Sequence, residues 1–80
     1  MNPLIEYTVS EMNEMYFVEK RTNTHEKITT VAGPFVRPST AWNHAQTLAR
    51  RDARLLGKRA TYTTATLLSG DAARACWKIV

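Results

Sequence analysis

The chain has 80 residues, a formal net charge of +4 and a single cysteine, Cys76. This length predicts one domain, residues 1–80, and one cysteine excludes an intramolecular disulfide. A hydrophobic share of 44% favours a folded core, and no uncharged run is long enough to cross a bilayer. The first residues lack the basic and apolar segments of a secretory signal, so we expect a cytoplasmic protein without membrane attachment.

The N-terminal segment, residues 1–14, predicts an edge strand or an ordered arm. Residues 4–9 alternate apolar and polar side chains with a period of two, which is typical of a half-buried strand. Residues 10–14 are polar and predict a turn or loop. We therefore expect this segment to lie at the margin of the fold.

The next segment predicts a β-hairpin. Residues 15–22 are rich in β-favouring side chains and predict a strand. Residues 23–25 predict the connection, and residues 27–32 predict the returning strand. Gly33-Pro34 then predicts the end of that strand, because proline lacks the amide that a central strand donates.

The segment from Pro38 to Gly57 has the strongest helical signal. Ser39 or Thr40 can cap its first amides, and Gly57 suits the left-handed residue that ends many helices. Apolar residues recur at helical spacing and form one arc. The arc consists of Ala41, Trp42, Ala45, Leu48, Ala49, Ala53, Leu55 and Leu56. The alanines predict a close approach to a sheet, with the larger side chains filling both sides.

Asp52 falls within this apolar arc. A buried carboxylate needs hydrogen-bond or charge partners. The functional interpretation is a carboxylate that binds a ligand. The structural interpretation, which we prefer, is a salt bridge or a hydroxyl contact with the sheet, or a position at the open edge of the arc.

The C-terminal part predicts a second pair of strands. Residues 60–68 are rich in threonine and tyrosine, residues 69–71 predict a turn, and residues 73–80 predict a returning strand. A short helical turn at residues 72–75 is the alternative. The sum is an α+β fold of order (β)ββαββ: an antiparallel sheet of four or five strands with one helix on one face. We expect the other sheet face to be open.

Charge is distributed unevenly along the chain. Residues 1–19 contain four glutamates and no lysine or arginine, whereas residues 50–59 contain five cations and one aspartate. The candidate partner-binding residues are Arg50, Arg51, Arg54, Lys58 and Arg59. They suit an acidic protein surface or nucleic acid, and the alternative is a solvated helix face. Tyr16 and Tyr62 are candidate contacts on the open sheet face, unless they belong to the core.

The sequence does not favour catalysis. His25 and His44 have no neighbouring group that the sequence places to activate them, and Cys76 adjoins the core candidate Trp77. A buried, inert thiol is therefore the preferred interpretation of Cys76. No metal-ligand spacing and no glycine-rich phosphate loop is present, so we expect no cofactor, no metal and no enzymatic activity.

The layout YFVEKRTNTHEKITTV, then PSTAWNHAQTLARR, then ATYTTATLL resembles small strand–strand–helix–strand proteins of phages and mobile elements, some of them anti-CRISPR proteins. The resemblance covers residues 16–80 as a pattern. It implies a protein without catalysis that docks on and inhibits a host protein or nucleoprotein complex in the host cytoplasm. The alternative is a nucleic-acid-binding module that uses the basic helix face. Either a monomer or a homodimer is consistent with the sequence.

Overall fold

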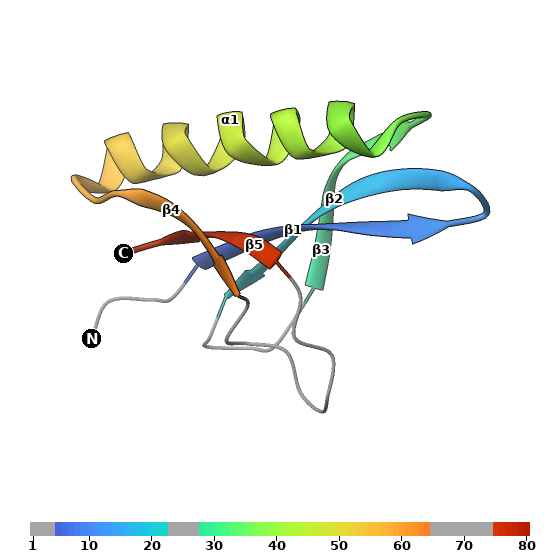
Figure 1. Ribbon diagram of the computed structural model, residues 1–80. Coiled ribbons are helices and arrows are strands. Elements are labelled where there is room, and N and C mark those ends of the chain that lie inside the picture. The colour runs from blue at the N-terminus through green and yellow to red at the C-terminus, as the bar shows by residue number, and fades with distance from the viewer. Residues whose placement is uncertain (1–4, 23–27, 65–74) are drawn as a thin grey trace.

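The computed structural model describes residues 5–22, 28–64 and 75–80. These residues form the strands β1 (Ile5–Met12), β2 (Met15–Thr22), β3 (Ile28–Phe35), β4 (Ala60–Thr64) and β5 (Ala75–Ile79), and the helix α1 (Pro38–Leu56). The strands make one antiparallel sheet of order β3-β2-β1-β5-β4, and α1 lies along one face of it (Figure 1). The predicted α+β class is confirmed. The predictions for residues 23–25, 65–71 and 72–74, and for His25, lie outside the described residues.

The first strand lies at the centre of the sheet, so the prediction of an edge strand or arm is wrong. β1 pairs with β2 from Ile5↔Thr22 to Met12↔Met15, and on its other side with β5. Residues 10–12 belong to the strand, and the turn contains only Asn13 and Glu14, both with positive φ. Two such residues match the right-handed twist of the flanking strands. β1 is central because it has a partner strand on each side, which the alternation along one strand does not reveal.

The third strand continues through Gly33-Pro34 to Phe35, so the prediction that this dipeptide ends the strand is wrong. β3 is an edge strand, where a residue without an amide hydrogen is tolerated. The register with β2 shifts near Val18, which marks a bulge. Gly33 has a φ of +116°, and a Cβ there would come within 2.9 Å of the Tyr16 carbonyl oxygen and of Phe17. The glycine thus lets the two chains approach.

The helix begins at Pro38, one residue before the predicted caps. Arg37 is the N-cap and makes no side-chain cap hydrogen bond, so the prediction of Ser39 or Thr40 as the cap is wrong. The locked φ of proline suits the first helical position, where no amide hydrogen is needed. The predicted end at Gly57 is confirmed. Gly57 has a φ of 67°, and the amide of Lys58 donates to the Ala53 carbonyl at 2.7 Å in a Schellman turn.

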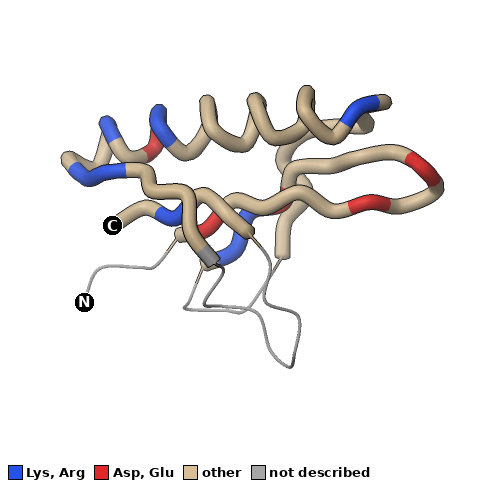
Figure 2. Tube along the Cα trace, viewed as in Figure 1, with Lys and Arg blue, Asp and Glu red and all other residues tan. Residues whose placement is uncertain are grey.

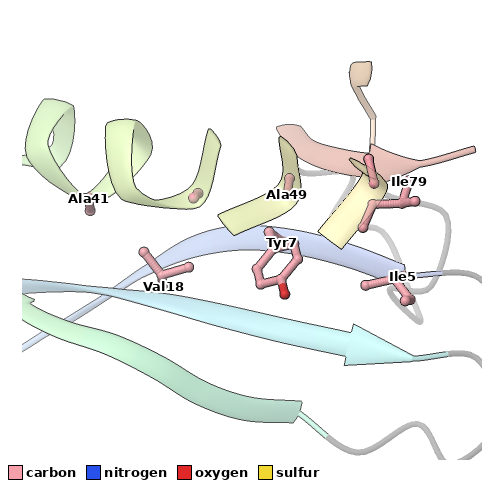
Figure 3. Close-up of a cluster of buried hydrophobic side chains, with 8 residues drawn as sticks. Ile5, Tyr7, Val18, Ala41, Ala49 and Ile79 are labelled. Atoms are coloured by element: carbon pink, nitrogen blue, oxygen red, sulfur yellow. The ribbon is translucent and has the colours of Figure 1, made fainter. Parts of the chain in front are cut away.

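Four alanines form the buried face of α1. Ala41, Ala45, Ala49 and Ala53 are spaced four residues apart and are all buried. They pack on a cluster that includes Ile5, Tyr7, Val18 and Ile79, as Figure 3 shows for the labelled side chains. The predicted close approach of helix and sheet is confirmed by this packing.

Two leucines of the predicted apolar arc do not join this core. Leu55 is 78% exposed and Leu56 is 50% exposed, so the prediction that they fill the sides of the helix is wrong. Trp42 and Leu48 do pack against the core cluster. Helical periodicity gives the direction of a side chain, but burial also needs sheet residues beneath it.

The sheet face away from α1 is closed at its centre, so the prediction of an open face is wrong there. Glu6 and Cys76 point away from the helix face yet are 1% and 0% exposed, and Thr8 is buried too. In the sheet register, Glu6 is paired with Arg21 on β2 and with Lys78 on β5. A central carboxylate therefore has long cationic side chains in both neighbouring strands.

Enlarging the alanine face tests this packing. Ala45→Leu or Ala49→Leu should lower the free energy of unfolding by about 1–3 kcal/mol, because each forces extra carbons into a filled contact. Asn43→Leu places the same side chain on the exposed side of α1 and should change stability by about 0.5 kcal/mol or less. Urea denaturation measures both. Equal midpoints for the three variants would contradict the assigned helix face.

Candidate functional site

A basic groove lies between the C-terminal half of α1 and the start of β4. Its volume is about 440 Å³. Its lining consists of Arg50, Ala53, Arg54, Lys58, Arg59 and Ala60. Four of these six residues are cations: Arg50 and Arg54 lie in α1, and Lys58 and Arg59 lie in the connection from α1 to β4. We call this surface the basic groove.

The backbone positions the four cations from both sides. Arg50 and Arg54 each follow a buried alanine by one residue, so they project from the same flank of α1. The Schellman turn at Gly57 then reverses the chain and brings Lys58 and Arg59 back beside them. The backbone of Arg59 exchanges two hydrogen bonds with Val80, at 2.9 and 2.8 Å. Both walls of the groove are therefore held by main-chain structure.

The charge of the groove is uncompensated within its described lining. None of the lining residues that the structure describes is an aspartate or glutamate. Figure 2 shows lysines and arginines gathered at the end of α1 and in the segment that leads into β4, and acidic residues near the far β1–β2 turn. Clustered positive charge in a concave surface raises the local concentration of anions. Such a surface suits phosphates or carboxylates.

The structure brings together four of the five predicted partner-binding residues. Arg51 is the exception: it is exposed on α1 but is absent from the groove lining. Arg50 and Arg54 are exposed, and Lys58 is half-buried. Arg51 thus serves as a natural comparison for the groove residues.

A row of aromatic side chains adjoins the basic groove. The ring centroids of Trp42 and Tyr62 are 5.6 Å apart in an edge-to-face arrangement, and those of Tyr62 and Trp77 are 5.3 Å apart. The guanidinium carbon of Arg50 lies 5.8 Å from the Trp77 ring centroid. We call the rings of Trp42, Tyr62 and Trp77 the aromatic row. Because Arg50 lines the groove and also contacts the Trp77 ring, the groove and the aromatic row are continuous.

The two tyrosines predicted for the open sheet face lie instead on the helix side. Tyr62 contacts Trp42 of α1, and Tyr16 packs against the core cluster, so this prediction is wrong for both. Tyr16 also donates a hydrogen bond to Glu11, which raises the pKa of the Tyr16 hydroxyl. Alternation along a strand separates two faces but does not say which one the helix covers. The aromatic row depends on the pairing of Tyr62 with Trp77 across β4 and β5, which the sequence pattern of either strand does not contain.

Asp52 joins the helix to the sheet, in line with its structural interpretation. The Tyr7 hydroxyl donates a hydrogen bond to Asp52 Oδ2, and the Lys20 ammonium lies 3.4 Å from the same oxygen. Burial, together with the bond to Asp52, raises the pKa of the Tyr7 hydroxyl. Asp52 also lines a pocket of about 230 Å³ with Ile5, Lys20, Leu55 and Leu56. Both expected structural contacts are thus present, the hydroxyl from Tyr7 and the salt bridge from Lys20.

The candidate nucleophile is a buried thiol. Cys76 is fully buried and its Sγ donates to Glu6 Oε2 at 3.5 Å. Burial, and then the charge of Glu6, raises the pKa of this thiol to about 12. His44 contacts the Phe35 ring at a centroid distance of 4.6 Å. Among the described residues, no group of three histidine, cysteine, aspartate or glutamate side chains could hold a metal ion.

Comparison with known proteins found no matching family model, no matching curated protein and no matching solved structure. In the described part of the chain, no helix combines the length and the apolar character that crossing a membrane requires.

The reactivity of Cys76 tests its burial. Since the thiolate is the reactive form, a thiol-reactive disulfide reagent near pH 8 should modify the folded protein far more slowly than the protein unfolded in guanidinium. Folding raises the thiol pKa from 9.0 to about 12, so its contribution to stability is lost as the pH rises between these values. In Cys76→Ala, the free energy of unfolding should fall less steeply with pH over this range. Equal rates of modification in both states would contradict a buried thiol.

The link between Asp52 and the sheet has its own test. Tyr7→Phe keeps the ring but removes the hydroxyl that donates to Asp52. We expect the free energy of unfolding to fall by about 1.5–3 kcal/mol, because a half-buried carboxylate loses a charge-assisted partner. Combining it with Asp52→Ala, which removes the acceptor, in a double-mutant cycle measures the coupling. Additive effects of the two substitutions would show that the hydrogen bond contributes nothing.

Proposed function

We propose that this protein is a non-enzymatic binding protein whose basic groove holds an anionic partner. The observation that carries the proposal is the convergence of four cations, two from α1 and two from the connection to β4, on one groove whose described lining contains no carboxylate. Guanidinium groups bind phosphates and carboxylates through short, charge-assisted hydrogen bonds. The buried, raised-pKa thiol of Cys76 gives no support to a nucleophilic role.

Two classes of anionic partner suit this groove. One is the acidic surface of a host protein or nucleoprotein complex, which a phage-encoded inhibitor of the anti-CRISPR type would block by docking. The other is nucleic acid, bound through its phosphates. The groove has the charge that either partner requires, and the aromatic row beside it favours the second.

A pair of charge-reversal variants tests the role of the basic groove. Arg50→Glu with Arg54→Glu should weaken binding to a polyanion such as immobilised heparin, so that this variant elutes at lower salt. Arg37→Glu with Arg51→Glu is the matched control, because both residues are exposed and lie outside the described groove lining. Both double variants change the net charge equally. The groove variant should lose at least about tenfold in affinity relative to the control, or about 1.4 kcal/mol.

The same two double variants also test whether the groove binds a partner from a cell lysate. As bait in nuclease-treated bacterial lysate, the parent and the control should retain an acidic protein partner that the groove variant loses, whereas a nucleic-acid partner should be lost from all three proteins. In the heparin experiment, elution of both double variants at the same salt concentration would show that net charge alone governs binding. The basic groove would then be a solvated surface.

A further inference from the structure

We propose that the basic groove and the aromatic row together bind a single-stranded nucleic acid, with phosphates in the groove and a base stacked on Tyr62. This inference rests on the proposed function of the groove as an anion-binding surface. It adds the class of partner and the residue that would recognise its bases.

The first observation that supports the inference is that the basic groove and the aromatic row are continuous. Arg50 lines the groove while its guanidinium lies over Trp77, whose ring contacts Tyr62. Ala60, at the edge of the groove, precedes Tyr62 by two residues on β4, which corresponds to about 7 Å along a strand. A phosphate in the groove and its neighbouring base could therefore be held by adjacent parts of one strand.

The second observation that supports the inference is that the Tyr62 ring is exposed and yet held in place. Tyr62 is 54% exposed although its ring touches both Trp42 and Trp77. The two tryptophans are half-buried and pack against the core cluster, so they hold the tyrosine in place. A ring held in one orientation with free surface loses little conformational entropy when a base stacks on it.

The aromatic row also determines which form of nucleic acid fits. In a duplex, the faces of the bases are already stacked inside the helix and cannot reach a side chain. In a single strand they are available, and proteins that bind single strands combine a basic groove with stacking aromatic residues. We therefore expect selectivity for single strands without strong sequence preference.

Fluorescence anisotropy with labelled oligonucleotides tests the partner class. A single strand of about twelve nucleotides, as DNA and as RNA, should bind at least about tenfold tighter than the corresponding duplex. Four phosphate contacts predict a slope near −3 for log affinity against log salt between about 50 and 200 mM. Binding should also quench tryptophan fluorescence, because Trp77 and Trp42 touch the stacking ring.

Two substitutions of Tyr62 test the stacking contact. Tyr62→Phe keeps the aromatic face and should bind the single strand within about twofold of the parent. Tyr62→Leu keeps an apolar side chain but removes the face, and should weaken single-strand binding about fivefold or more while leaving duplex binding unchanged. Thermal melting confirms that both variants are folded. If Tyr62→Leu does not fold, the stacking contact is judged from whether the single strand quenches the tryptophan fluorescence of the parent.

Several outcomes would overturn the inference. These are equal affinity for single strands and duplex, parent-like binding by Tyr62→Leu, or no quenching on binding. If no oligonucleotide binds at about 50 mM salt, the inference fails. The groove itself is judged separately, because loss of polyanion or lysate-partner binding in Arg50→Glu with Arg54→Glu would still support the proposed function with an acidic protein as partner.

Discussion

The close contact between α1 and the sheet through four alanine methyl groups determines where the side chains of the candidate site lie. Because no larger side chain separates the two layers, the residues on either flank of the alanines lie at the junction between helix and sheet. On one flank Asp52 reaches Tyr7 and Lys20 of the central strands. On the other flank Arg50 reaches Trp77, which places its charge at the basic groove.

The basic groove concentrates like charges that repel one another. The Schellman turn at Gly57 forces Lys58 and Arg59 to return beside Arg50 and Arg54, so a local backbone feature creates the charge cluster. The helix dipole stabilises cations at the C-terminal end of α1, which offsets part of this repulsion. A bound anion would offset this repulsion, and it would stabilise the folded protein if it bound the assembled groove more tightly than the unfolded chain.

The sequence predicted features that depend on local spacing. The four-residue interval of the alanines identified the buried helix face, Gly57 identified the helix end, and the run from Arg50 to Arg59 identified most of the groove. Strand order and the choice of sheet face depend on pairing between distant residues, which alternation along one strand does not contain. This is why β1 was expected at the margin and Tyr62 on the wrong face. The burial of Glu6 on the far face follows from the central place of β1 in the same way.

The place of β5 between β1 and β4 has a consequence for how the protein is made. Ile5 pairs with Ile79, so the central pair of strands joins residues from nearly opposite ends of the chain. Such pairing closes a long loop and forms late. During synthesis, β5 must leave the ribosome before β4 has a sheet to join and before Arg59 can bond to Val80. The basic groove is therefore complete only after residues 75–80 have been made, and until then the cations of α1 lack the opposite wall.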